Sequence, residues 1–252
     1  MKPYFCTNPS MNKFLLFLTV LLLASSCRDE QSFGMLPMTY LQDDPKVQLQ
    51  LPQADSTIQL GRAVNEALEE EVIALLAFDE ALNIEDIPMA VQSFSAGYTE
   101  LIENFPETPE WEASVNASIS FEDAYMLSIK MESYLFTGGA HGYEEVRFLN
   151  FDKRRGREIE GINMFTNFGP ILTLAENAFR EMHNIPEEAS INSTGFMFEG
   201  EVFYLPDTIG FDSHGMVLYY NQYEVASYAD GPIRISLPWV DVQPLLRNKY
   251  RP

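Results

Sequence analysis

The feature that most constrains the fold is a segment of strict two-residue periodicity at 111–122. Its apolar residues alternate with polar residues without a break, and they are Trp111, Ala113, Val115, Ala117, Ile119 and Phe121. A period of two places successive side chains on opposite faces of a β-strand. The segment therefore predicts a strand with one buried face and one solvated face. We expect Ile119 to lie on the buried face.

Other strands are predicted on both sides of this segment. Two follow directly, at 124–136 and 144–151, and the second ends at a turn over 152–156. Consecutive strands with short links favour an antiparallel meander. Alternation also predicts a half-buried strand over 46–52, and shorter strands are expected at 195–206, 215–221 and 232–237.

Segments with helical periodicity lie between and after these predicted strands. Apolar residues spaced three and four apart predict helices over 61–82, 86–104, 168–183 and 240–247. Asp86 is placed to cap the second helix, and Pro88 lies in its first turn, where a missing N–H costs nothing. The order of elements predicts an α+β fold, with an antiparallel meander sheet and helices packed on one of its faces.

Charge limits the class of partner. The chain of 252 residues carries 37 Asp and Glu against 16 Lys and Arg, a formal net charge of −21. A nucleic-acid-binding face needs clustered Lys and Arg, so no nucleic-acid partner is expected. The acidity suits a basic protein, although solubility alone also explains it. The hydrophobic content of 46% is enough for a packed core and excludes overall disorder.

The N-terminus has the features of an export signal. Lys13 precedes an apolar run at 14–24 that is too short to span a bilayer, and small residues lead to Cys27. This order resembles the lipobox of bacterial lipoproteins, in which the cysteine is lipidated and becomes the new N-terminus. The alternative is an ordinary cleaved signal followed by an incidental cysteine. Met11 is a better start than Met1, because the prefix 1–10 is polar and contains proline.

These features predict a signal peptide at 1–26 and a lipid anchor with a polar tether at 27–45. Arg28, Asp29 and Glu30 follow the cysteine. A basic residue and then acids at this position resemble the surface-export signal of Bacteroidetes lipoproteins. We therefore expect an outer-membrane lipoprotein, and both the cell surface and the periplasmic side of that membrane remain open.

The residues alone do not assemble a catalytic set. Of the three histidines, His141 lies in the glycine-rich stretch 137–142, His183 ends a predicted helix where a positive charge suits the helix dipole, and His214 lies in a turn. The spacing typical of zinc ligands is missing, and so are the nucleophile elbow, the dinucleotide-binding loop and the P-loop. No catalytic residue, metal ligand or cofactor is assigned.

Two motifs resemble those of a known pair of domains. The first is Gly-Gly-Ala-His at 138–141, followed by Asn150 and Asp152 and then Gly156, and the second is Tyr-Glu-Val-Ala-Ser-Tyr-Ala-Asp-Gly at 223–231. Together they resemble the paired extracytoplasmic domains of the RsiV anti-sigma factor ectodomain and of PdaC-type peptidoglycan deacetylases. The resemblance implies a PdaC-like module at 46–160 and an RsiV-like module at 161–252, packed as one unit.

The resemblance implies a binding module. In the deacetylases the metal-dependent chemistry belongs to a separate domain, and in the anti-sigma factor the ectodomain binds lysozyme. The expected function is thus that of a membrane-anchored envelope lipoprotein that binds a protein, such as lysozyme, or a cell-wall glycan. The alternative is a glycan hydrolase or deacetylase-type enzyme centred on His141, so enzymatic activity is not expected but stays open.

The predicted ligand-binding residues come from the two motif segments. They are Gly138, Gly139, His141, Tyr143, Tyr223 and Tyr228. Exposed tyrosines often anchor interfaces, and glycines let the backbone approach a ligand closely. The alternative is that both segments serve the fold alone, with glycines for positive φ and tyrosines for packing.

Overall fold

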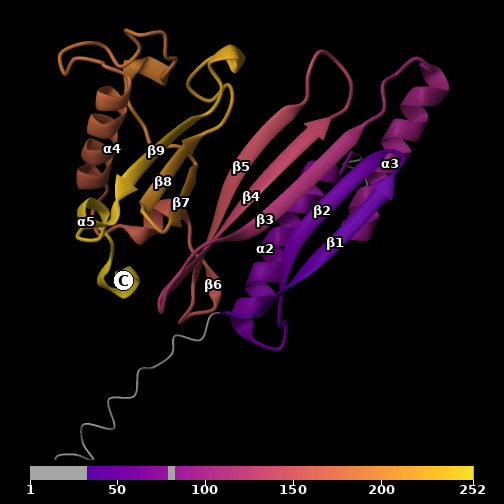
Figure 1. Ribbon diagram of the computed structural model, residues 1–252, viewed down its shortest axis with the longest axis horizontal. Helices are drawn as coiled ribbons and strands as arrows, with labels where there is room; N and C mark the ends of the chain where they lie inside the picture. The colour runs from indigo at the N-terminus through magenta and orange to yellow at the C-terminus, as the bar shows by residue number, and fades with distance from the viewer. Residues whose placement is uncertain (1–32, 79–82, 252) are drawn as a thin grey trace, which may run out of the picture. The chain divides into compact units, whose positions relative to one another are not determined.

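The computed structural model describes residues 33–78 and 83–251, which belong to one compact unit that begins at Ser32. The predicted signal peptide, Cys27 and the last residues of the first predicted helix (79–82) lie outside the described residues. The fold is α+β, as predicted, but its strands form two sheets where the sequence predicted one (Figure 1).

The larger sheet has six strands in the order β1-β2-β3-β4-β5-β6. They are β1 (Met35–Asp43), β2 (Lys46–Ala54), β3 (Glu112–Glu122), β4 (Met126–Phe136), β5 (Tyr143–Asp152) and β6 (Arg157–Glu158). The predicted meander is present from β3 to β5, whose pairings are antiparallel. β2 pairs with β3 in parallel, because two helices carry the chain back between them.

The predicted tether is wrong over its second half. Residues Met35–Asp43 form β1, which pairs along its whole length with β2 in an antiparallel hairpin. Its partly buried residues, such as Met38 and Tyr40, pack against the core of the larger sheet. The prolines and polar residues of this stretch obscured the strand, and Pro37 is tolerated because β1 lies at the sheet edge.

Two helices cover one face of the larger sheet. They are α2 (Gln59–Leu76) and α3 (Ile87–Asn104). The Asp86 carboxylate accepts a hydrogen bond from the Met89 backbone N–H at 2.8 Å, which confirms the predicted cap. The core beneath includes Val64, Phe94 and Leu49, which are fully buried. Among the described residues, no helix has the length and apolar character needed to cross a membrane.

The buried phase of β3 ends earlier than predicted. Ala113, Val115 and Ala117 face the helices and are buried, but Ile119 is 39% exposed. The pairing with β4 shifts register between Ile119 and Phe121, where a β-bulge inserts one residue. The bulge moves Phe121 toward the second core, where it packs against Trp239.

The smaller sheet has three antiparallel strands in the order β7-β8-β9, and α4 and α5 pack against it. The elements are α4 (Phe168–Met182), β7 (Thr208–Asp212), β8 (Gly215–Tyr220), β9 (Ile233–Pro238) and α5 (Trp239–Val242). The predicted strand at 195–206 is wrong, because that stretch forms turns and a short 3-10 helix. The predicted last helix is shorter, and other short 3-10 helices lie at Gly161–Met164, Tyr228–Asp230 and Asn248–Tyr250.

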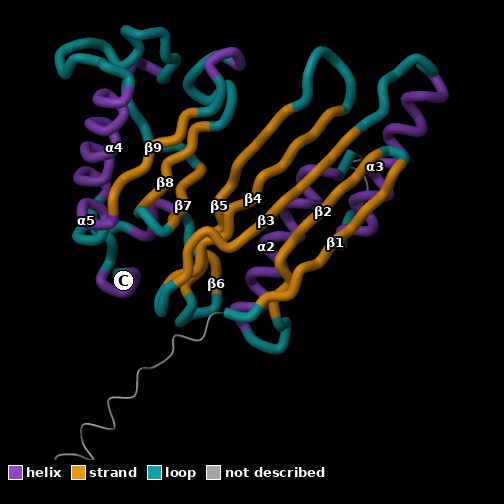
Figure 2. The backbone as a smooth tube through the Cα atoms, in the orientation of Figure 1, coloured by secondary structure: helices purple, strands orange, loops and turns teal. Residues whose placement is uncertain are grey.

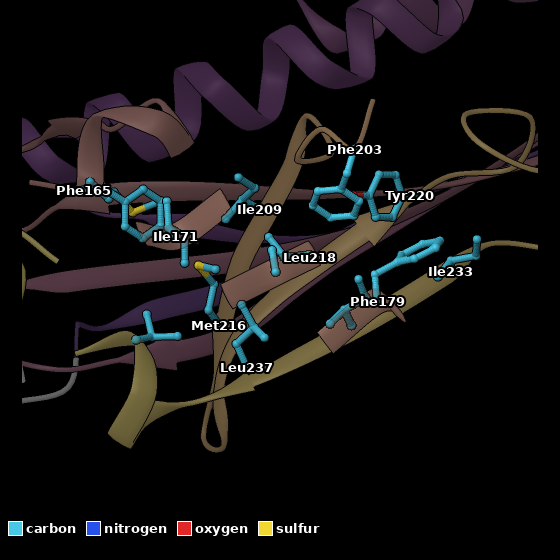
Figure 3. Packing of buried hydrophobic residues seen from close by; sticks show 14 of the residues in the cluster. Phe165, Ile171, Phe179, Phe203, Ile209, Met216, Leu218, Tyr220, Ile233 and Leu237 are labelled. Carbon is cyan, nitrogen blue, oxygen red and sulfur yellow. The ribbon is translucent and has the colours of Figure 1, made fainter. Parts of the chain in front are cut away.

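The smaller sheet has its own aromatic core. Phe179 of α4 meets Tyr220 of β8 edge to face, with ring centroids 6.0 Å apart (Figure 3). Both side chains are fully buried, and the Tyr220 hydroxyl donates a hydrogen bond to the Tyr204 carbonyl. Burial of the phenol, with smaller effects of Glu224 and Tyr204, raises the pKa of Tyr220, so this hydroxyl stays a donor at neutral pH.

A buried polar network joins the two sheets. The Ser128 hydroxyl of β4 donates to the Asn150 amide oxygen of β5 at 2.9 Å, and the Asn150 amide donates to the carbonyl of Ile209 in β7 at 2.7 Å. The Phe211 N–H of β7 donates to Ser128 at 3.2 Å. β7 therefore packs on the face of the larger sheet that α2 and α3 leave open.

Candidate functional site: an aromatic surface formed by two loops

The structure brings together residues from both motif segments. The His141 ring, from the loop between β4 and β5, stacks on the Tyr228 ring, with centroids 3.9 Å apart and planes inclined by 19°. Tyr228 in turn lies 5.5 Å from Tyr223. We call His141, Tyr223 and Tyr228 the aromatic surface. Figure 2 shows the two loops that carry it, β4–β5 and β8–β9, as connections at the ends of neighbouring strands.

The glycines of the first loop have different roles. Gly138 and Gly139 adopt φ of 100° and 95°, a region that other residues rarely occupy, and neither has an atom within 4 Å of where a Cβ would lie. Glycine is therefore required at these two positions by the backbone conformation and not by lack of space. Gly142 instead packs under the Tyr134 ring, at a distance that leaves no room for a side chain. The loop is thus shaped to hold His141 beyond the end of the strands.

The second loop is fixed to the larger sheet by Asn221. Its side-chain oxygen accepts from the Val146 N–H at 2.8 Å, and its amide donates to the Val146 carbonyl at 3.0 Å. The Asn221 N–H donates to the Glu224 carboxylate at 2.9 Å. Asn221 therefore pairs with β5 as a strand residue would, which sets the position of the tyrosines that follow it.

The backbone of the second loop is locally strained. Tyr223 adopts φ of 68°, which is uncommon for a tyrosine, and its side chain is 56% exposed. Ser227 and Asp230 form a capping box around the 3-10 helix that carries Tyr228. Strained positions that the surrounding structure enforces are found mostly at functional sites.

Tyr143 and several carboxylates flank the aromatic surface. The Tyr143 side chain is 39% exposed, and burial of its hydroxyl, followed by the charges of Glu145 and Glu224, raises its pKa. Burial also raises the pKa of Glu224. Next to these residues, Glu144 and Tyr219 line a polar hollow of about 460 Å³ over the open face of the larger sheet. The region is acidic and aromatic.

The other two histidines are structural. His183 packs between Phe179 and Phe196, with ring centroids 4.5 and 4.6 Å away, and burial lowers its pKa. The predicted favourable charge at the helix end is therefore wrong, since burial disfavours the imidazolium. His214 lies in a turn, as predicted, and its backbone N–H donates to the Asp212 carboxylate at 2.7 Å. Within the described ranges, no three His, Cys, Asp or Glu side chains are grouped to hold a metal ion.

Comparison with protein families gives two matches. Residues 42–144 match the model described as deacetylase PdaC, and residues 163–240 match a protein of unknown function, DUF3298. The chain carries a PdaC-like segment followed by a DUF3298 segment. The predicted pairing of two such domains is confirmed. His141 lies in the PdaC-like segment and Tyr228 in the DUF3298 segment, so the aromatic surface is made by both.

Two solved structures share this fold. A DUF3298 family protein from Pseudomonas aeruginosa PAO1 is similar at 20% identity with a TM-score of 0.58, covering 87% of this chain and 95% of that one. A member of the same family from Bacteroides fragilis is similar at 18% identity with a TM-score of 0.60, covering 86% and 93%. Comparison with curated proteins gives no match. At these identities the structural similarity establishes the fold.

Sequence reasoning found the aromatic residues but missed the contacts that hold them. Asn221 and Tyr134 were not singled out, although the first fixes one loop and the second supports the other. Asn221 directly follows a strand, where an amide side chain is able to extend the pairing. An asparagine at the end of a strand is only a weak indication of such pairing when the neighbouring strand is not known.

Proposed function

We propose that this protein is a membrane-anchored lipoprotein of the cell envelope that binds a cationic protein at the aromatic surface and does not turn over a substrate. The observation that carries the proposal is the stack of His141 on Tyr228 beside the exposed Tyr223. Lipid on Cys27 provides the anchor. A lysozyme-like protein is the favoured partner, and a cell-wall glycan is the alternative ligand.

The aromatic surface has the chemistry of an interface anchor. Tyrosine offers a large apolar area at low entropy cost and keeps a hydroxyl for hydrogen bonding. The loops are held by Asn221 and by the capping box of Ser227 and Asp230, so little ordering entropy opposes binding. The preorganisation of these two loops supports a role in recognition over a purely structural role.

Charge favours a basic protein over a neutral glycan. Glu145 and Glu224 lie close enough to Tyr143 to raise its pKa, and the whole chain carries −21. A positive partner would be steered to this surface and would associate more slowly as salt screens the field.

The surroundings of His141 support stacking over general-base catalysis. Its Nδ1 lies 2.9 Å from the carbonyl oxygen of its neighbour Gly142, to which it donates, and one face of its ring is covered by Tyr228. A general base needs a free acceptor nitrogen in reach of a substrate proton. With Nδ1 donating, Nε2 is that acceptor, but among the described residues no carboxylate hydrogen-bonds to the imidazole to orient it as a base. The stack on Tyr228 is the stronger contact of the ring, which favours a supporting role.

Binding to hen lysozyme, measured by calorimetry with the non-lipidated mature chain, tests the proposal. Tyr228→Ala removes the centre of the aromatic surface and should weaken binding by about 2 kcal/mol, roughly thirtyfold. Phe105→Ala is the matched control, because Phe105 is an exposed aromatic residue (64%) at the end of α3. The control should leave the affinity unchanged.

Two results would contradict the proposal. Equal losses for Tyr228→Ala and Phe105→Ala would place the binding elsewhere. If lysozyme is not bound and the protein hydrolyses or deacetylates glycan in a way that His141→Ala abolishes, then the enzyme alternative is correct. If the protein instead binds cell-wall glycan, and Tyr228→Ala but not Phe105→Ala weakens that binding, then the aromatic surface is the binding site and the glycan is its ligand.

A further inference from the structure

The basic residues of this acidic protein gather at one end of the fold. They occupy the turn between β5 and β6, the start of β6 and the C-terminal segment. Seven of the 16 Lys and Arg residues lie there, namely Lys153, Arg154, Arg155, Arg157, Arg247, Lys249 and Arg251. We call this group the basic end. In a chain with a net charge of −21, such clustering is unexpected for a merely solubilising surface.

Four of these side chains line one cavity. It has a volume of about 340 Å³ and is bordered by Arg155, Arg157, Arg247 and Lys249, with Asn163 and Tyr250 completing the wall. Glu158 and Glu160 also border it, so cations outnumber carboxylates there by four to two. The cavity is large enough for a phosphate group and has donors on several sides.

Most cations elsewhere in the described chain have a close carboxylate. Lys46 lies 2.6 Å from Glu112, Lys130 2.6 Å from Glu132, Arg147 3.0 Å from Glu71, Arg180 2.8 Å from Glu176, and Arg234 2.7 Å from Asp212.

Of the seven cations at the basic end, all within the described residues, Lys153 alone has a close carboxylate, that of Glu122 at 2.6 Å. Arg155 and Lys249 approach the buried Asp152 at 3.9 and 3.7 Å. Arg157 and Arg247 make no ion pair within the described residues. The Arg247 Nε donates to the Phe165 carbonyl at 3.0 Å, which holds that guanidinium in place. Its other N–H groups and the Arg157 guanidinium are available to an external anion.

The basic end lies where the described chain begins. The Phe33 N–H donates to the Glu122 carboxylate at 2.6 Å, and the Lys153 ammonium donates to the same oxygen at 2.6 Å. Figure 1 shows β6 and the C-terminus at the end of the fold where the coloured chain starts. Cys27 precedes Phe33 by six residues, and an extended chain of that length reaches about 20 Å at most. A lipid on Cys27 would hold the basic end close to the bilayer.

We propose that the basic end binds the phosphate groups of anionic phospholipids and thereby orients the folded unit on the membrane that carries its anchor. Arginine recognises phosphate through two parallel N–H bonds, and each basic residue near an anionic surface adds about 1 kcal/mol. Repulsion from the many acids elsewhere is weak, because charges more than about 8 Å away are screened at physiological ionic strength. The aromatic surface plays no part in this site.

Vesicle co-sedimentation of the mature chain with Cys27→Ser tests this assignment, because no acyl chain then contributes. The variant retains every residue of the compact unit. The protein should bind phosphatidylcholine vesicles that contain phosphatidylglycerol and should not bind pure phosphatidylcholine. Replacing Arg155 and Arg157 together with Gln should weaken binding roughly thirtyfold, and raising the salt concentration should weaken it further.

The control changes the net charge equally at another place. Lys46→Gln with Lys130→Gln also removes two positive charges, and both lysines are partly exposed at other positions of the sheet. This control should bind the anionic vesicles as the parent does. Equal losses for both pairs, or binding without preference for phosphatidylglycerol, would overturn the proposal. Displacement of the protein from vesicles by millimolar inorganic phosphate would make this a site for soluble anions instead.

Discussion

Asn150 shows how one residue can couple the two sheets. It is 3% exposed, receives a hydrogen bond from Ser128 and donates one to Ile209 across the sheet interface. Asn150→Ala would leave the buried Ser128 O–H without its acceptor and would remove the Asn150 donor to the Ile209 carbonyl. The free energy of unfolding should fall by about 3 kcal/mol, measured by urea denaturation.

The matched change is Asn104→Ala at the exposed end of α3, where the amide donates to the Glu100 carbonyl at 2.8 Å. That substitution should change stability by less than about 0.5 kcal/mol. A similar small effect for Asn150→Ala would mean that water replaces its contacts and that the interface is more open than the structure shows.

At the scale of single residues, the sequence predicted which side chains matter at the candidate site but not how they meet. Gly138 and Gly139 were identifiable because a glycine pair in a loop signals positive φ. The stacking of His141 on Tyr228 joins residues far apart in the chain, and no local pattern encodes that distance. The basic end was missed for the same reason, since its two segments are separated in sequence.

The strand β3 provides a test at the scale of elements. Val115 is 1% exposed under the helices, whereas Ile119, just before the bulge that shifts the register, is 39% exposed. Val115→Asp would bury an unpaired charge and should cost several kcal/mol, of the order of 3–5 kcal/mol. Ile119→Asp should cost less than about 1 kcal/mol. Thermal unfolding of the two variants measures the difference.

Equal losses in melting temperature for the two variants would show that Ile119 is as buried as Val115. The comparison is informative because both residues belong to the same uninterrupted alternation. The pattern 111–122 fixes the type of element, but it cannot show where a bulge ends the buried phase.

Elements with long, regular periodicity were predictable, and short or irregular ones were not. α3 and α4 agree with prediction to within a residue or two, because apolar stripes and caps mark both. β1 was missed because its side chains are only partly buried, so its composition resembles a tether. β7 has five residues, and four of them are buried without alternation, as is usual for a strand covered on both faces.

At the scale of the whole molecule, the distribution of charge predicts an orientation. The basic end lies by the first described residues, and the aromatic surface lies at the connections β4–β5 and β8–β9. With lipid on Cys27, binding would take place away from the membrane. Cys27→Ala should abolish labelling by a fatty-acid analogue and leave only the salt-sensitive binding of the basic end, so that a high-salt wash releases the protein from the membrane.

Labelling that persists in Cys27→Ala would contradict lipidation at this cysteine. Protease added to whole cells then distinguishes the two membrane faces. Digestion in intact cells would indicate the cell surface, and protection until lysis would indicate the periplasmic side.

The parallel pairing of β2 with β3 has a consequence for the order of folding. Lys46 and Glu112 are neighbours in the sheet but 66 positions apart in the chain. The hairpin of β1 and β2 therefore has no neighbouring strand until both helices and β3 have been synthesised. Contacts of such long sequence separation close slowly. During folding the hairpin should be the last part of the larger sheet to become protected from hydrogen exchange.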